Sequence, residues 1–265
     1  MRPADPRDNP GLILAALTLG LVVLFVPPVD GPVRAAAAPP PAPAAAPAQL
    51  PAPAPKQLVV AMDAQPVVLA DQTAERPGVR TVALTFDDGP DPRWTPQILA
   101  VLRRYGAVAT FCVVTNNVRE HPELVRDIVD AGMRLCDHTR SHPDNLTALP
   151  PDQQENEIVG ARTDMAAATD APVAYFRAPG GHFSPPVLDL AAHHGMQPLG
   201  WSVDPRDWEQ PGVPAIVYGM QTKVRPGAVI LLHDGGGHRQ ETVDALEVLL
   251  PWLVAQGYRF SFPTP

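Results

Sequence analysis

Short apolar runs alternate with longer helix-like segments along most of the chain, from about residue 79 onward. The apolar runs, which are typical of strands, lie at residues 82–86, 107–114, 133–136, 173–176, 196–203, 228–232 and 258–262. The helix-like segments lie at residues 96–105, 122–131, 152–168, 185–194, 214–224 and 241–256. This alternation predicts an α/β fold, in which helices pack outside a parallel sheet. The units fit either a doubly wound sheet or a shortened barrel, because the region is smaller than the usual barrel of about 250 residues.

The beginning of the chain has a different composition. Residues 11–26 are apolar and uncharged, and small residues follow at 35–38, as in a secretory signal or an N-terminal membrane anchor. Residues 35–55 are almost entirely alanine and proline, which favours an extended spacer. We therefore expect a signal or anchor (1–34), an Ala/Pro-rich disordered linker (35–56), a lead-in segment (57–79) and a globular domain (80–262). The domain would be secreted or held at the extracellular cell surface.

Charge and cysteine content narrow the classes of function. The chain has a net charge of −8, and residues 1–56 contribute four basic and three acidic side chains, which leaves about −9 on the remainder. An acidic domain without a basic patch argues against nucleic acid as a partner. In an exported protein the pair Cys112 and Cys136 favours a disulfide, with two buried free thiols as the alternative. Zinc binding by the pair is not favoured, because no C-x-x-C spacing is present.

Polar residues follow the predicted strands at the point where each strand ends. They are Asp87, Asp88, His138, Arg177, Asp204, Asp207, His233 and Asp234. In both candidate architectures, ligands bind at the carboxyl ends of the strands. We therefore expect these groups to converge on one rim of the sheet.

The sequence HTRSH places His138 and His142 four residues apart. On a helical turn both rings would share a face and reach one ion, with Asp88 as the candidate third ligand. Two nitrogens and one carboxylate oxygen leave a coordination position for water, as in catalytic zinc sites. Taken alone, this spacing also fits two surface histidines on a loop.

Five motifs occur in order along the chain. They are TFDDGP (85–90), HTRSH (138–142), RAPGG (177–181), VDPRDW (203–208) and LLHD (231–234). Together they resemble the motifs of the polysaccharide deacetylases, the NodB-homology domain of carbohydrate esterase family four, over roughly residues 80–262. With this family in view, we expect a distorted, shortened (β/α) barrel of about seven parallel strands.

The resemblance implies a role for each motif residue. Asp87 resembles the general base, and Asp88, His138 and His142 resemble the ligands of one divalent metal ion, either zinc or a substitute such as cobalt. Arg177 would hold Asp87, while Asp207 would orient His233 as the general acid. The backbone N–H of Gly180 would sit where the family places an oxyanion donor, and Trp201 and Leu231 resemble residues that form an acetyl pocket.

Some positions depart from the family pattern or match no motif. Cys136 and Asp137 stand where the family commonly has Gly-Asn, and Gly180 stands where many relatives carry Tyr. We interpret the remaining histidines as surface or loop residues: His121, His182, His193, His194 and His238. Of these, His182 is close enough to the RAPGG motif to leave its role open. Trp208 fits core packing as well as a cleft wall.

The expected activity is metal-dependent removal of acetyl groups from a polysaccharide, most simply N-deacetylation of N-acetylglucosamine residues in peptidoglycan or chitin-like polymers. An O-acetyl esterase acting on acetylated xylan would use the same machinery. A silent carbohydrate-binding domain is a second alternative, although every catalytic position is filled. A glycosidase fits less well, because its carboxylates must lie on opposite sides of a sugar bond. We expect a monomer, which contacts a membrane only through an N-terminal anchor.

Overall fold

The computed structural model describes residues 79–264. Its strands are β1 (Arg80–Asp87), β2 (Ala109–Val113), β3 (Arg134–Asp137), β4 (Val173–Phe176), β5 (Gln197–Pro198), β6 (Val229–His233) and β7 (Tyr258–Phe260). Its helices are α1 (Thr95–Arg104), α2 (Thr115–Glu120), α3 (Pro122–Asp130), α4 (Pro151–Ala168), α5 (Pro185–His193), α6 (Val213–Lys223) and α7 (Gln240–Ala255). Short 3₁₀ turns lie at η1 (Leu146–Ala148), η2 (Pro179–Gly181) and η3 (Asp207–Glu209).

The predicted signal or anchor and the linker lie outside the described residues, as does the lead-in segment up to residue 78. Among residues 79–264, no helix combines the length and the apolar character needed to cross a membrane.

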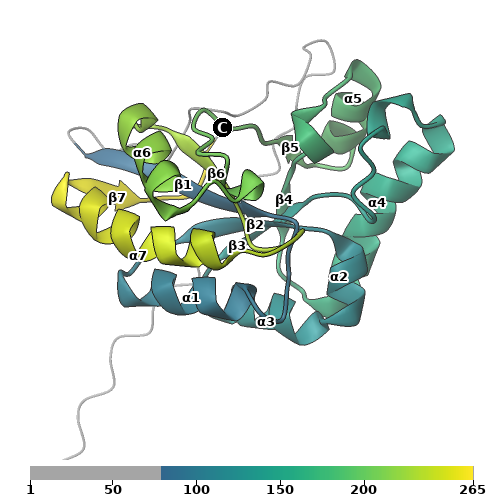
Figure 1. Cartoon of the computed structure of the whole chain (residues 1–265). Helices are drawn as coiled ribbons and strands as arrows, with labels where there is room; N and C mark the ends of the chain where they lie inside the picture. Colours follow the sequence, from purple (N-terminus) through teal and green to yellow (C-terminus); the bar gives the residue numbers. More distant parts are fainter. Residues whose placement is uncertain (1–78, 265) are drawn as a thin grey trace, which may run out of the picture. The chain divides into compact units, whose positions relative to one another are not determined.

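The strands form one parallel sheet that curls on itself. Its order is β5–β4–β3–β2–β1–β6, and β7 pairs with the first residues of β1 (Figure 1). Beyond β5, the chain crosses to the other end of this order, where Val203 forms a parallel bridge with Ile230 of β6. This arrangement confirms the predicted distorted, shortened (β/α) barrel of about seven parallel strands.

Successive side chains of each strand point to opposite faces of the sheet, so one set fills the barrel interior and the other packs under the helices. The interior cluster takes one buried residue each from β1, β2, β3, β4, the segment after β5, and β6: Ala83, Cys112, Cys136, Tyr175, Leu199 and Val229. On the other face of β1, Val82, Leu84 and Phe86 join the larger core shared with the helices. Outside the sheet, α1 packs against both α3 and α7, and α7 also packs against α6.

The two cysteines form a disulfide inside the barrel, so the disulfide prediction is confirmed. Cys112 of β2 lies directly opposite Cys136 of β3 in the parallel register. On its other side, Cys112 is paired with Asp87, the last residue of β1. The disulfide therefore joins β2, which lies next to the end of β1, to β3 on the other side of β2.

One predicted strand was wrong, and one helix was missed. Residues 196–203 do not form one strand, because Pro198 cannot donate to a ladder and the Arg177 guanidinium takes the carbonyls of Leu199 and Gly200. Helix α2 was not predicted, because its sequence TNNVRE is short and polar and carries little apolar periodicity.

Candidate metal centre and active site

The two acidic residues of TFDDGP leave β1 in different directions. Asp87 is the last strand residue, and its backbone pairs with Cys112 of β2 and His233 of β6. Asp88 has a φ of 72°, in the left-handed region that non-glycine residues seldom adopt, and a cis Gly89–Pro90 peptide follows. The left-handed conformation of Asp88 turns the chain, so the two neighbouring carboxylates can point to different partners.

The predicted metal ligands lie together. Asp88 Oδ1 is 3.5 Å from His138 Nε2 and 3.4 Å from His142 Nε2. Each of the three side chains offers a ligand atom, and these atoms all lie within 4.8 Å of one another. The assumed helical turn is wrong, since residues 138–142 form a loop in which Thr139 and His142 both have positive φ. The turns of this loop, rather than a helix face, bring the second imidazole back to Asp88.

Two further observations fit a cation at this cluster. Oδ1 of Asp88 is buried and has no hydrogen-bond partner among residues 79–264, which is costly for a carboxylate oxygen. His138 Nδ1 donates to the carbonyl of Arg177 at 2.8 Å, so the lone pair of Nε2 faces the carboxylates. Metal-binding histidines are commonly oriented by such a bond on the other ring nitrogen. The residues present therefore suit a divalent ion.

The electrostatics of the cluster also favour positive charge. Burial alone would raise the pKa of Asp88, but His138, His233 and His142 lower it well below its ordinary value. Burial likewise opposes the charged form of His138, yet Asp87, Asp88 and the Arg177 carbonyl raise its pKa above the usual range. A bound cation would take the place of this proton, because metals bind the neutral imidazole.

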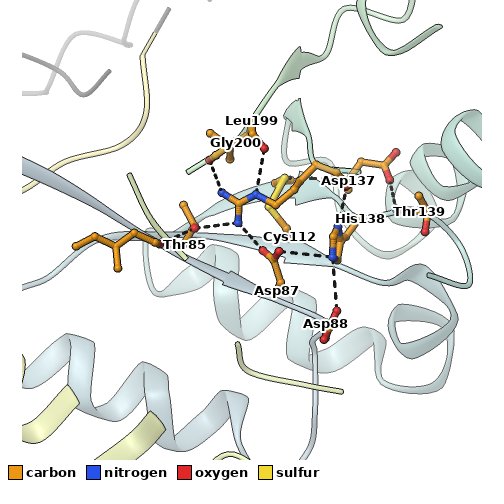
Figure 2. The surroundings of a disulfide bond; sticks show 12 residues. Thr85, Asp87, Asp88, Cys112, Asp137, His138, Thr139, Leu199 and Gly200 are labelled. Atoms are coloured by element: carbon orange, nitrogen blue, oxygen red, sulfur yellow. Dashed lines mark hydrogen bonds and ion pairs between the residues drawn. A yellow bond between two sulfur atoms is a disulfide. The ribbon is translucent and has the colours of Figure 1, made fainter. Parts of the chain in front are cut away.

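Asp87 is held beside the cluster by a buried arginine. Arg177 Nη1 donates to Asp87 Oδ1 at 2.6 Å and to Thr85 Oγ1 at 2.9 Å, while its other nitrogens donate to the Leu199 and Gly200 carbonyls. The second oxygen of Asp87 lies 3.5 Å from His138 Nε2. Figure 2 shows Asp87 and Asp88 approaching the same nitrogen of His138 from different sides. Asp87 therefore has one oxygen fixed and one turned to the metal cluster.

A second histidine stands on the opposite side of β1, at the end of β6. His233 Nδ1 lies 2.8 Å from Asp207 Oδ1, and the His233 backbone N–H donates to Asp207 Oδ2 at 2.9 Å. Thr242 donates to the same Oδ2, so Asp207 is fixed by α7 as well. Burial lowers the pKa of His233, but Asp207, Asp87 and Asp88 raise it above its ordinary value. The ring is therefore oriented and biased toward its protonated form.

The residues predicted to form the acetyl pocket lie near these groups. The Trp201 ring centroid is 5.5 Å from the Arg177 guanidinium carbon, and Leu231 precedes His233 by two positions on the same face of β6. A Cβ on Gly181 would come within 2.6 Å of the Trp201 ring, so the RAPGG loop packs directly on this indole. Gly180 has a φ of 60°, which suits glycine.

Two buried carboxyls were given no role from the sequence, although Asp234 was among the polar residues expected on the rim of the sheet. Asp137 accepts a bond from the Thr139 N–H at 2.7 Å, and burial raises its pKa to about 8. Asp234 accepts a bond from Thr95 at 2.5 Å, and burial, with Asp88 and Asp87 nearby, raises its pKa to about 7. Their positions directly before His138 and after His233 were the available signal.

The remaining candidates lie at the surface. Each histidine outside the motifs is at least partly exposed: His121, His182, His193, His194 and His238. Trp208 is 44% exposed, so it does not belong to the core. An open cavity of about 470 Å³ begins at Asp88 and His142 and is also lined by Asn117, Glu120 and His121.

Comparisons with known proteins agree with the site. The sequence model described as "Polysaccharide deacetylase" matches residues 74–199. A chitooligosaccharide deacetylase from a Bradyrhizobium strain is 39% identical over 199 residues, covering 71% of this chain and 90% of that protein. A peptidoglycan-N-acetylglucosamine deacetylase from Bacillus cereus is 40% identical over 183 residues, covering 68% and 85%.

The fold also matches solved structures. A pseudoenzyme of carbohydrate esterase family four from Bacillus anthracis superposes with a TM-score of 0.65 at 29% identity, over 70% of this chain and 64% of that longer chain. The identity and coverage of the two deacetylases establish the relationship independently of this fold match. The chain belongs to the polysaccharide deacetylase family, that is, carbohydrate esterase family four.

Proposed function

We propose that the chain is an exported, zinc-dependent enzyme that removes acetyl groups from N-acetylglucosamine residues of a polysaccharide. The proposal depends on one arrangement above all. The donor atoms of Asp88, His138 and His142 face one another, and the free oxygen of Asp87 lies beside them. Ligands on tetrahedral zinc lie roughly 3.3 Å apart, close to the 3.4 and 3.5 Å separations between Asp88 and the two imidazoles.

The side chains around the metal site have complementary roles. A divalent cation held by the three ligands would lower the pKa of water at the site and polarise the acetyl carbonyl. Asp87 would take a proton from the attacking water, and Arg177 keeps the carboxylate aimed at this position. The backbone N–H of Gly180 would donate to the oxygen of the tetrahedral centre.

The leaving nitrogen needs a proton before the carbon–nitrogen bond breaks. His233 would donate this proton from Nε2, because its Nδ1 is engaged by Asp207. The oxygen of the attacking water is by then bonded to the carbonyl carbon, so breaking the carbon–nitrogen bond releases acetate and a free amine. Trp201 and Leu231 would enclose the acetyl methyl group between the metal site and His233.

The substrate class follows from the relatives and the chemistry. Two similar curated proteins are named for chitooligosaccharide and for peptidoglycan N-acetylglucosamine, and both substrates carry N-acetyl groups on sugars. The raised pKa of His233 favours N-acetyl over O-acetyl substrates, because an amine leaving group depends on protonation more than an alkoxide does. An O-acetyl esterase remains the second candidate, since it would use the same residues.

The geometry weighs against the other two alternatives. A glycosidase places its carboxylates across a sugar bond, whereas Asp87 and Asp88 both approach His138 Nε2. A silent domain is a pertinent alternative, because a structural relative is a pseudoenzyme. In the present chain the metal cluster, the Asp87–Arg177 pair and the His233–Asp207 pair are all assembled.

The proposed compartment is the cell surface or the extracellular space. The disulfide between Cys112 and Cys136 supports an oxidising environment. The apolar segment at residues 11–26 supports export as a signal or an anchor. We propose that the domain acts there as a monomer.

Acetate release tests the proposal. N-acetylglucosamine oligomers, peptidoglycan and acetylated xylan should be incubated with the metal-depleted protein, before and after one equivalent of zinc is restored. The proposal expects acetate from the N-acetylated substrates only when zinc is present. Faster release from acetylated xylan would assign the chain to the O-acetyl esterases, and the absence of acetate from all three, with zinc bound, would support a silent domain.

A further inference from the structure

The loop that carries the two histidine ligands is fastened to α4 through residues that bind no metal. Arg140 lies between the histidines in the sequence, and its side chain points to the helix. Its Nε donates to Asp164 Oδ2 at 2.9 Å, Nη1 donates to Asn156 Oδ1 at 2.5 Å, and Nη2 donates to the Gly160 carbonyl at 3.2 Å. One guanidinium thus bonds three positions spaced along α4.

A glutamate of the same helix holds the loop backbone. Glu157 Oε2 accepts the N–H groups of Arg140 at 3.1 Å and Ser141 at 2.8 Å, and Oε1 accepts the Ser141 hydroxyl at 2.8 Å. From the other side, the backbone N–H groups of Thr115 and Asn116 in α2 donate to the carbonyls of Thr139 and Arg140. The residues immediately before His142 are therefore held on two sides.

Gly160 explains how the arginine fits against α4. Glycine within a helix is unfavourable, so its presence calls for a local reason. A Cβ at this position would come within 2.9 Å of the guanidinium carbon of Arg140. The missing side chain leaves space for the guanidinium to lie against the backbone of the helix.

We propose that the seat formed by Arg140, Glu157 and Gly160 positions His142 and thereby sets the metal affinity of the site. His142 needs such support, because it has a positive φ of 56° and its side chain is 32% exposed. The histidine at the other end of the loop, His138, is buried and fixed by its bond to the Arg177 carbonyl. The inference rests on the proposed function in that it takes Asp88, His138 and His142 as a metal site.

The direction in which metal affinity changes when Arg140 is replaced distinguishes a positioning role from a simple electrostatic one. Arg140 is a cation near a site for a cation, so removal of its charge alone would strengthen metal binding. Loss of the seat would weaken metal binding, because His142 would spend less time in the ligating position. Changes in groups that orient metal ligands typically cost about 10–100-fold in affinity or activity.

The test is a titration of zinc against a chelating indicator, with wild type and Arg140→Met compared. Methionine keeps a long apolar stem and removes the guanidinium. The matched control is Arg104→Met, which removes an arginine that pairs with Glu247, at the end of α1 remote from the site. We expect zinc affinity to fall at least about fivefold in Arg140→Met and to stay unchanged in the control, while kcat recovers at saturating zinc.

Gly160→Ala provides a second variant should Arg140→Met fold poorly. Alanine favours the helix, which offsets part of the cost of the displaced bonds, so the variant should fold. Its methyl group would displace the guanidinium and weaken zinc binding. Unchanged or tighter zinc binding in either folded variant would overturn the proposal. A wild-type protein that binds no zinc would instead refute the metal site itself, and a wild type that binds zinc without releasing acetate would refute only the proposed function.

Discussion

The raised pKa of Asp137, the residue before the candidate ligand His138, can be tested sharply. Asp137 is fully buried and directly precedes His138. In the described part of the chain, its Oδ1 accepts a hydrogen bond from the N–H of Thr139 and its Oδ2 has no partner. Burial raises its pKa from 3.8 to about 8. The change to examine is Asp137→Asn, which keeps the shape, retains an acceptor for Thr139 and removes the titrating group.

The sign follows from the difference between the folded and unfolded states. Below about pH 4 both states hold the proton, and Asp137 imposes no penalty on folding. Between about pH 4 and pH 8 the unfolded chain releases the proton while the folded protein retains it, so the free energy of unfolding falls as the pH rises. The slope is at most about 1.4 kcal/mol per pH unit, or roughly 3 kcal/mol between about pH 5 and pH 7.

The assay is urea unfolding of the metal-depleted protein at both pH values, with wild type and Asp137→Asn measured side by side. The variant should gain stability over wild type as the pH rises, by roughly 1 to 3 kcal/mol across this interval. An equal difference between the two proteins at both pH values would show that Asp137 ionises normally. The assignment of a protonated carboxyl beneath the metal site would then be wrong.

Three further predictions concern the reaction. Asp87→Asn should lower acetate release about 10²–10⁴-fold while the zinc content, measured by mass spectrometry, stays near that of wild type; loss of the zinc would make Asp87 a ligand instead. Burial opposes the protonated His233 ring, but Asp207 raises its pKa, so kcat should decline only above the ordinary histidine range. Asp207→Asn should move that decline to lower pH, and an unmoved pH profile would remove Asp207 from this role. Gly236→Ala would place a methyl group against the carboxylate of Asp88. It should weaken zinc binding at least about tenfold in a titration with a chelating indicator. Unchanged binding would mean that the loop carrying Gly236 moves to accept the methyl group.

Much of the fold was readable because its strands are buried on both faces. The runs that became β1, β2 and β6 are continuous and apolar, and periodicity identifies such segments well. The segment at residues 196–203 was read as a strand for the same reason. Its irregularity arises from Arg177, whose bonds to Leu199 and Gly200 are contacts that no local pattern encodes.

The site was partly predictable for a related reason. Polar residues at the ends of parallel strands must meet, so the convergence of Asp88, His138 and His142 followed from the topology. The local conformation could not be predicted in the same way. Positive φ angles at Thr139 and His142 bring residues i and i+4 together in a loop, as a helical turn would also do. The packing of Arg140 against Gly160 could not be predicted from the sequence either, since it depends on how the loop meets α4 in space.

The central claim is that one divalent ion at Asp88, His138 and His142 is required for deacetylation. Its most direct test is a titration of the metal-depleted protein with zinc, in which acetate release from N-acetylglucosamine oligomers and bound zinc are measured on the same samples. The account predicts that activity rises in proportion to bound zinc and reaches a plateau at about one ion per chain. Full activity in the metal-depleted protein, or a plateau unrelated to bound zinc, would contradict it.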